Sequence, residues 1–180
     1  MNRTRKARFR VRSSKEIYRD RYLKVVRRDG SLPTRVEATF TVIEHPGACA
    51  IVPIFENGDL LLLRQFRVAP EEELIEIPAG TREEGETPLE TARREVIEET
   101  GYRARKLTRL GTFYMAPGFC NEVMHLFAAR GLSPARTNLD AEEVIRPLRV
   151  SRREAMRMVR TGRIRDAKTL VGLLLTDRTI

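Results

Sequence analysis

Residues 80–102 constrain this chain most, because they combine strong helix signals with a dense run of glutamates. Thr87 can cap the amino end of a helix, and Pro88 suits the first helical position. Glu90 completes a Thr-x-x-Glu capping box. Gly101 follows where a left-handed carboxyl-terminal cap is favoured. The sequence therefore predicts a helix that begins at the proline and ends just before this glycine.

The predicted helix, residues 88–100, carries carboxylates where they can meet. Seven glutamates lie in residues 83–99, although the chain of 180 residues has a formal net charge of +9. Glu95 and Glu99 are one turn apart, and Glu98 lies slightly further round the helix. Such carboxylates repel one another unless a cation neutralises them, and their oxygens suit a hard divalent metal such as Mg²⁺. The alternative is a solvated acidic helix face.

The spacing of the whole stretch resembles the Nudix box. The matching positions are Gly80, Glu86, Arg94, Glu95, Val96, Glu98, Glu99, Gly101 and Tyr102. The resemblance implies an α/β fold, an α/β/α sandwich with a mixed sheet and a small amino-terminal antiparallel sheet. It also implies hydrolysis of a nucleoside diphosphate linked to another moiety, with Mg²⁺ as the cofactor and Mn²⁺ as an alternative.

The same resemblance assigns expected roles within the box. Glu95 and Glu99 are the first-choice metal ligands, Glu98 is the third, and the backbone carbonyl of Ala79 completes the set. Arg94 matches the arginine that holds the box glutamates in place, and its spacing from Glu98 fits that role.

A general base for the attacking water is expected on a loop after the box. The acidic stretch in residues 139–148 offers Glu142 and Glu143, and its spacing from the following strand favours Glu143. The alternative is an exposed acidic loop without a catalytic role. His125 is a weaker candidate, because a lone histidine in an apolar strand is usually structural.

Basic residues ahead of the box are candidates for binding the substrate's phosphates. Arg64 and Arg67 lie near the carboxyl end of a predicted strand, and the resemblance implies that Arg67 contacts phosphate. The alternative for Arg67 is a surface ion pair with the glutamates of residues 71–73.

A proline after the box bears on the choice of substrate. Pro117 lies sixteen residues after Gly101, a spacing similar to that of ADP-ribose-hydrolysing members of the family. The resemblance therefore implies cleavage of ADP-ribose to AMP and ribose 5-phosphate, with activity on other nucleoside diphosphate sugars. GDP-mannose or another such sugar as the main substrate is the alternative.

The positive charge is concentrated at the amino end. Residues 1–28 contain twelve Lys or Arg against two acids, so the remaining residues sum to −1. Residues 1–16 are therefore expected to form a basic arm, which is solvated or binds an anionic partner. A nucleotide-sensing or RNA-associated binding protein is the competing function from a different class, although no nucleic-acid motif accompanies the charge.

Residues 17–45 are expected to form a small sheet, with strands over residues 23–28 and 36–43. The sheet resembles the one that makes a dimer interface and clasps the base in ADP-ribose pyrophosphatases, so a homodimer is expected. Tyr22 and Tyr18 are candidates for stacking on the nucleobase, with core packing as the alternative.

Residues 46–180 are expected to form the Nudix domain. Residues 49–55 and 60–67 flank an Asn-Gly turn and are predicted to pair as a buried hairpin. Further strands are expected over residues 105–114 and 121–130, followed by two helices over residues 151–162 and 166–177.

The composition bears on the cellular location of the protein. No run approaches 18 apolar residues, so no membrane span is expected, and the basic amino end has no apolar core of a secretory signal. The two cysteines, Cys49 and Cys120, lack metal-ligand spacing and are expected to be buried free thiols. These features favour a cytoplasmic enzyme.

Overall fold

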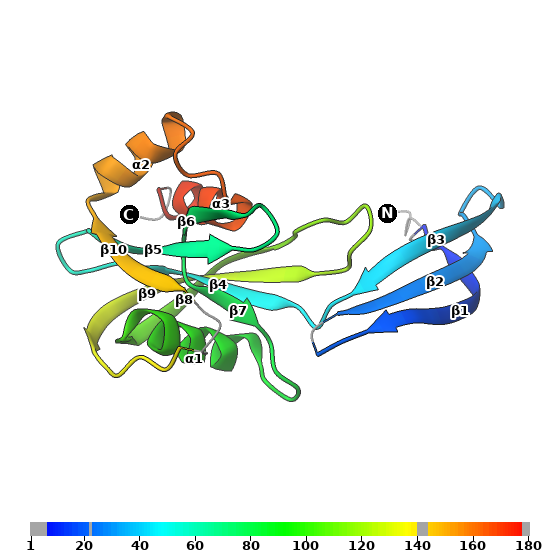
Figure 1. Cartoon of the computed structure of the whole chain (residues 1–180), viewed down its shortest axis with the longest axis horizontal. Helices are drawn as coiled ribbons and strands as arrows, with labels where there is room; N and C mark the ends of the chain where they lie inside the picture. Colours follow the sequence, from blue (N-terminus) through cyan, green and yellow to red (C-terminus); the bar gives the residue numbers. More distant parts are fainter. Residues whose placement is uncertain (1–6, 22, 140–143, 178–180) are drawn as a thin grey trace, which may run out of the picture. The chain divides into compact units, whose positions relative to one another are not determined.

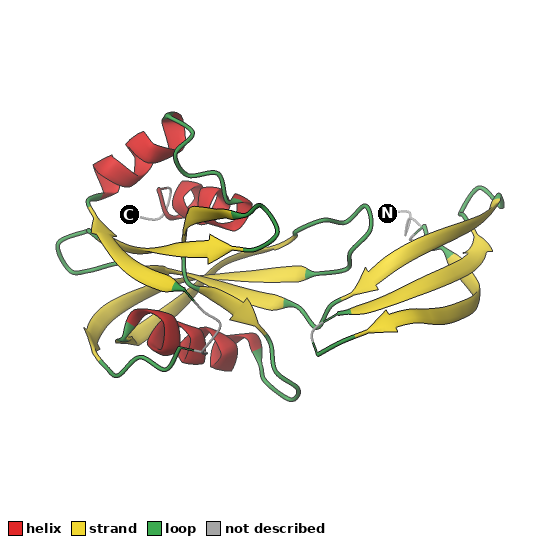
Figure 2. Cartoon of the chain, in the orientation of Figure 1, coloured by secondary structure: helices red, strands yellow, loops and turns green. Residues whose placement is uncertain are grey.

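A computed structural model of the chain describes residues 7–21, 23–139 and 144–177 (Figure 1). Strands predominate in these ranges, accompanied by helices near the middle and the end of the chain (Figure 2). No helix in the described ranges is long and apolar enough to cross a membrane. In chain order the elements are β1 (Arg10–Arg19), β2 (Lys24–Ser31), β3 (Glu37–Glu44), β4 (Ala48–Pro53), β5 (Leu60–Arg67), β6 (Glu72–Glu76), β7 (Ala79–Thr81), α1 (Pro88–Thr100), β8 (Tyr102–Tyr114), β9 (Val123–Pro134), β10 (Ile145–Val150), α2 (Arg152–Arg160) and α3 (Ala167–Asp177).

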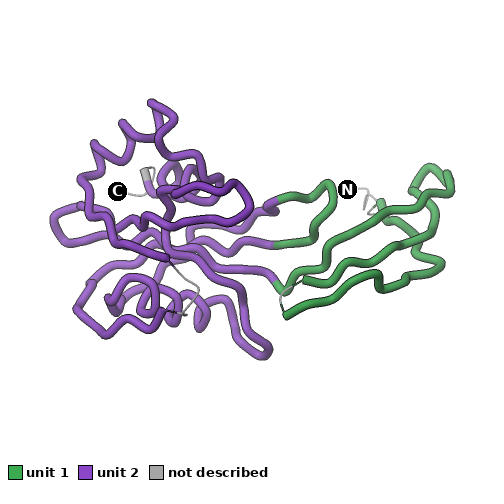
Figure 3. The backbone as a smooth tube through the Cα atoms, viewed as in Figure 1, with its two compact units in different colours: residues 1–46, 116–122 green, residues 47–115, 123–180 purple. Residues whose placement is uncertain are grey.

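One compact unit comprises residues 1–46 and 116–122 (Figure 3). Its described part is an antiparallel sheet in the order β1-β2-β3. The two strands expected here are present, and β1 adds a third strand that takes in part of the stretch expected to be a basic arm. All ten residues of β1 are exposed. Residues 116–122 join the unit through backbone bonds, with the Ile43 N–H donating to the Phe119 carbonyl over 2.7 Å.

The other unit comprises residues 47–115 and 123–180 (Figure 3). It contains a four-stranded sheet in the order β7-β4-β9-β8, in which β4 and β9 run parallel and the other neighbours run antiparallel. A second, antiparallel sheet has the order β10-β5-β6. The expected α/β fold with a mixed sheet is confirmed.

Strand β4 separates two hydrophobic cores. Its residues are all buried, and successive side chains of a strand point to opposite faces. Ala50 and Val52 pack in a cluster with side chains of β5, α2 and α3. Cys49 and Ile51 pack in a second cluster with Ala92 and other residues of α1 and β8. Helices α1 and α3 therefore cover opposite faces of the four-stranded sheet.

The prediction that β4 and β5 pair as a hairpin is wrong, although the turn between them forms. The Phe55 N–H donates to the Asp59 carbonyl over 2.9 Å, but the strands then separate into different sheets. A single bridge, Ile54 with Leu60, is what remains of their pairing in the described part of the chain. The separation occurs because β7 and β9 occupy the two edges of β4.

The two cysteines are free thiols in different surroundings. Cys49 is buried, its thiol donates to the Pro88 carbonyl over 3.1 Å, and burial raises its pKa to about 11. Cys120 is partly exposed, so the expectation of two buried thiols is correct for Cys49 alone.

Candidate active site

Helix α1 begins and ends at the residues that the sequence indicates. The Thr87 hydroxyl accepts from the Glu90 N–H, and the Thr87 N–H donates to the Glu90 carboxylate over 2.8 Å, which completes the capping box. Gly101 takes the left-handed conformation with φ of 70°, and its N–H donates to the Ile97 carbonyl. The ends of the helix are thus fixed by local interactions, and packing of Ala92 and Val96 in the core fixes which face it turns to the sheet.

Arg94 joins three carboxylates on this face and on the loop before it. Its Nη1 donates to Glu95 over 2.7 Å and to Glu98 over 3.0 Å. Its Nε and Nη2 donate to the two oxygens of Glu86 over 2.9 and 3.0 Å. The hydrogen bonds between Arg94 and Glu86 are the largest cause of two pKa shifts: they raise the pKa of Arg94 and lower the pKa of Glu86 to about 2. Arg94 therefore holds three neighbouring carboxylates together and stabilises the ionised form of Glu86.

Strand β7 lies directly against the acidic face of α1. The Ala79 N–H donates to the Glu99 carboxylate over 2.8 Å. A Cβ atom on Gly80 would lie 1.9 Å from Glu95 Oε1, so the absence of a side chain at this position lets the carboxylate approach the backbone. Glu95 and Glu99 are 6% and 3% exposed, respectively. Two nearly buried carboxylates thus meet the backbone of the segment that precedes the helix.

The chemistry of this group fits a hard divalent cation, because all of its donors are oxygens. The carboxylates of Glu95 and Glu98 bind Arg94, and that of Glu99 binds a backbone N–H. Across the residues that the structure describes, no three His, Cys, Asp or Glu side chains are already grouped to hold a metal ion. A bound cation would therefore compete with these contacts for the carboxylate oxygens.

Arg67 pairs with a buried carboxylate beside this site. Its Nε and Nη2 donate to the two oxygens of Glu76 over 2.8 and 2.7 Å, and Glu76 is 1% exposed. Glu76 also accepts from the Lys168 ammonium group. Burial raises the pKa of Glu76, but its bonds and charge attraction with these two cations outweigh that effect and lower it. The partner of Arg67 is thus Glu76, and not a glutamate of residues 71–73.

Arg64 and Pro117 lie in other surroundings. Arg64 donates to Glu73 over 3.1 Å, and Glu73 also pairs with Arg146. Pro117 is exposed in a tight turn of the first unit, where the Cys120 N–H donates to the Ala116 carbonyl over 2.8 Å.

Three of the expected site residues, Tyr22, Glu142 and Glu143, lie outside the described residues. His125 is described and lies on β9. Its Nδ1 is buried and has no hydrogen-bond partner among the residues that the structure describes. Burial, followed by the charges of Arg109 and Arg82, lowers its pKa. A neutral imidazole is consistent with the structural alternative considered for this residue.

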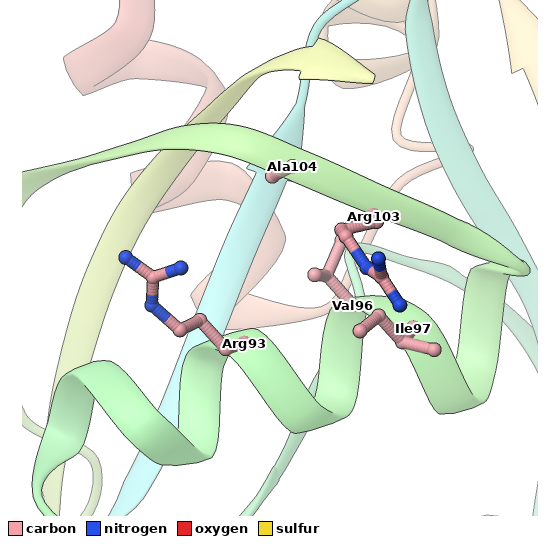
Figure 4. A pocket seen from close by; sticks show the side chains of 5 residues that line it. All are labelled: Arg93, Val96, Ile97, Arg103 and Ala104. Atoms are coloured by element: carbon pink, nitrogen blue, oxygen red, sulfur yellow. The ribbon is translucent and has the colours of Figure 1, made fainter. Parts of the chain in front are cut away.

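A small pocket lies away from the carboxylates, between α1 and β8 (Figure 4). Val96, Ile97 and Ala104 form its apolar part, and Arg93 and Arg103 flank it. Since none of the box carboxylates lines this pocket, it is separate from the acidic site.

Sequence reasoning missed Lys168 and Glu76. Both are nearly buried, and each carries a charge that would be costly without the other. The available signal was Asp166 at the start of a predicted helix, because an aspartate suits a helix N-cap and a lysine follows it two residues later.

The fold and the acidic site together define a Nudix hydrolase. A model of the NUDIX domain matches residues 44–171, and the chain belongs to this family. It is a Nudix pyrophosphatase, since relatives named ADP-ribose pyrophosphatase and GDP-mannose pyrophosphatase share this domain. Enzymes of this kind generally use a divalent metal.

The individual relatives cover most of the chain. The ADP-ribose pyrophosphatase of Bacillus subtilis (strain 168) is 36% identical over 163 residues, covering 89% of this chain and 88% of the relative. The methanol dehydrogenase activator of Bacillus methanolicus is 34% identical over 162 residues, with the same coverage of each chain. The GDP-mannose pyrophosphatase of Cronobacter sakazakii (strain ATCC BAA-894) is 38% identical over 136 residues, covering 71% of each. A crystal structure of an ADP compounds hydrolase superposes with a TM-score of 0.83 and 25% identity, covering 95% of this chain and 93% of that one.

Proposed function

We propose that this protein hydrolyses the pyrophosphate bond of ADP-ribose, giving AMP and ribose 5-phosphate, in a reaction that depends on Mg²⁺. The observation that carries the proposal is that Glu99 and Glu95 meet the backbone at Ala79 and Gly80, while Arg94 bonds both Glu95 and Glu98. The name of the Bacillus subtilis relative supports the substrate. Mn²⁺ is the alternative metal, and other nucleoside diphosphate sugars are further substrates.

The proposed metal ligands are the carboxylates of Glu95, Glu98 and Glu99 and the carbonyl of Ala79. A divalent cation held there would neutralise the pyrophosphate and stabilise charge on the leaving phosphate. Arg94 donates to both Glu95 and Glu98, so its positive charge offsets the repulsion between these two carboxylates. The buried setting strengthens each of these electrostatic interactions.

The remaining proposed roles concern the water and the substrate. Glu143, with Glu142 as the alternative, would take the proton of the attacking water. Arg67 would bind phosphate through the edge of its guanidinium group that faces away from Glu76. Arg64, Pro117 and Tyr22 complete the proposed substrate contacts.

The first unit has a proposed role in assembly. The exposed strand β1 supports a homodimer, since an uncovered strand offers both apolar side chains and backbone groups to a second copy. We propose residues 17–45 as this dimerisation and substrate-clasping sheet, residues 1–16 as a basic arm, residues 46–180 as the hydrolase domain, and the cytoplasm as its location. RNA binding by the basic arm remains the competing proposal, supported by charge alone.

A GDP-mannose pyrophosphatase is the second candidate function within the enzyme class. The relatives with this name match 71% of the chain at 35–38% identity. Measuring kcat/KM of this protein for ADP-ribose and for GDP-mannose decides between the two functions. The value for the preferred substrate should be at least about tenfold higher than the value for the other.

The proposal is tested by measuring AMP release from ADP-ribose in the presence of Mg²⁺. Glu99→Gln should lower kcat by about 100-fold or more while the protein stays folded, because a neutral amide is a poor ligand for a hard cation. Glu84→Gln is the matched control, since Glu84 is an exposed glutamate ahead of the helix. Absence of turnover by the wild-type protein on every sugar nucleotide would contradict the proposal.

A further inference from the structure

A buried charge cluster connects the start of α3 to Arg67. The Lys168 ammonium group donates to Glu76 and, over 3.0 Å, to Asp166 Oδ1. The Lys168 and Glu76 side chains are 9% and 1% exposed. With Arg67 on the other side of Glu76, two cations and two anions form a balanced group, which is the condition for burying charges at acceptable cost.

The same end of α3 holds the backbone that leads to the acidic site. Asp166 Oδ2 accepts from the Thr169 N–H over 2.9 Å and from the Thr169 hydroxyl over 2.5 Å. The oriented hydroxyl oxygen then accepts from the Ile77 N–H over 2.9 Å. Thr169 is fully buried and Ile77 is 1% exposed, so this N–H has no water to replace the bond.

Two residues after Ile77 the chain reaches Ala79, whose N–H binds Glu99. Lys168 fixes Glu76 on one side of Ile77, and Thr169 fixes Ile77 itself. The segment between β6 and β7 is thereby anchored on α3 before it meets the carboxylates of α1.

Arg67 is oriented by the same cluster. Its paired edge, Nε and Nη2, is committed to Glu76, which leaves the Nη1 edge for another anion. Its side chain is 38% exposed. The charge of Glu99 acts on Arg67, so the guanidinium group lies within electrostatic range of the acidic site.

We infer that Lys168 and Thr169 are positioning residues for the hydrolytic site. Lys168 acts through Glu76 to orient Arg67 toward a phosphate, and Thr169 acts through Ile77 to hold the backbone of Ala79 against Glu99. The inference rests on the proposed function for its catalytic consequence, while the anchoring of Ile77 stands independently of it.

The catalytic consequence is tested with Lys168→Met and Thr169→Val. Loss of a residue that orients a metal ligand typically costs roughly 10- to 100-fold in metal affinity or activity. Because Lys168 and Thr169 orient site residues in a comparable way, each variant should lose about tenfold or more in kcat/KM. Thr169→Ser, which keeps the hydroxyl, should stay near wild type. The matched controls are Lys106→Met, an exposed lysine on β8, and Thr176→Val, a buried hydroxyl of α3 that binds within its own helix.

A double-mutant cycle separates positioning from general destabilisation. If Lys168 acts through Arg67, the variant Arg67→Met/Lys168→Met should have the same kcat/KM as Arg67→Met alone. Additive losses would overturn this route. Equal kcat/KM for Thr169→Val and its Thr176→Val control would overturn the role of Thr169.

The anchoring is tested without activity by amide hydrogen exchange at Ile77. Thr169→Val should speed exchange of this N–H by about tenfold or more, corresponding to the loss of one hydrogen bond, whereas Thr176→Val should leave it unchanged. Unchanged exchange in Thr169→Val would overturn the anchoring. If the wild-type protein hydrolyses no sugar nucleotide, the proposed function fails, and the exchange result still decides whether α3 holds this segment.

Discussion

At the scale of single residues, Arg94 is the connection between the acidic helix and the loop that precedes it. It contacts three glutamates, and a backbone carbonyl of Thr81 accepts from its Nη2 over 3.2 Å. A planar guanidinium group can direct its N–H groups to several acceptors at once, whereas a lysine offers a single nitrogen. The geometry therefore requires arginine and not merely a positive charge.

Arg94→Lys should lower the free energy of unfolding by about 2 kcal/mol or more, because at least one charged hydrogen bond is lost beside buried carboxylates. Urea unfolding measures the change. Arg93→Lys is the control, since the neighbouring arginine is exposed on the same helix. An equal effect of the two substitutions would contradict the central position of Arg94.

The Glu86 carboxylate makes stability depend on pH in acid. Its pKa is lowered from 4.5 to about 2, chiefly by the hydrogen bond from Arg94. A lowered carboxylate pKa contributes stability that is present above the unfolded-state value and is lost as pH falls through the folded-state value. The stability difference between wild type and Glu86→Gln should therefore shrink from about pH 4.5 to pH 2 in urea unfolding measurements. A difference independent of pH across that window would disprove the coupling.

Gly80→Ala should disrupt the acidic site by steric conflict, since its Cβ would lie 1.9 Å from Glu95 Oε1. Glu95 must then move away from β7, and activity and stability should both fall. Gly111→Ala is the matched control, because its Cβ would meet Leu175 at an ordinary 3.5 Å. Thermal unfolding and turnover, measured side by side, should show a loss in the first variant and little change in the second.

At the scale of elements, sequence was informative where the determining interactions are local. Helix α1 was predicted with its caps because Thr87, Glu90 and Gly101 act within a few residues of one another. The pairing of β4 with β5 was predicted wrongly, because partners for β4 come from β7 and β9 elsewhere in the chain. The Asn-Gly turn determines that the chain reverses direction after β4. Which strands then pair with β4 is determined by competition among all the strands of the fold.

The contacts of the candidate site likewise fall into local ones, which the sequence predicts, and long-range ones, which it does not. The contacts among Arg94, Glu95 and Glu98 lie within about one helical turn and follow from spacing. The bond between Lys168 and Glu76 joins residues 92 positions apart, so no local pattern could reveal it. Arg67 is only nine positions from Glu76, but its side chain reaches along the β5–β6 pair to Glu76 and does not pair with Glu72, its direct partner in register, so the sequence does not reveal this contact.

The contribution of the α1 capping box to stability can be measured by substituting Thr87. Thr87→Ala should lower the free energy of unfolding by about 1 kcal/mol, because the Glu90 N–H loses its acceptor. Thr87→Ser should retain most of the stability, since serine offers an equivalent oxygen. Chemical denaturation of the three proteins compares them, and equal losses for Ala and Ser would show that the hydroxyl is not the stabilising group.

At the scale of the whole molecule, the chain is divided both by contacts and by charge. The net charge of +10 in residues 1–28 falls in the first unit, whereas the remaining residues sum to −1. Strand β1 in that unit has Val11, Ile17 and Tyr18 more than half exposed. Exposed apolar side chains on an edge strand are typical of an interface.

If β1 forms the proposed homodimer interface, Ile17→Asp should convert the dimer to a monomer, because an unpaired carboxylate would be buried between the copies. Sedimentation equilibrium measures the mass of both proteins. Val68→Asp is the control, since Val68 is 80% exposed in the other unit. A wild-type monomer, or a dimer that survives Ile17→Asp, would rule out this interface.

The division of the core by β4 has a consequence for insertions and deletions. Because alternate residues of this strand fill different cores, removing one residue would send every following side chain to the opposite face. A substitution in β4 disturbs one core, whereas a change in the number of its residues disturbs both. Over evolutionary time, descendants of this sequence can therefore exchange one apolar side chain for another along β4 but must preserve its length.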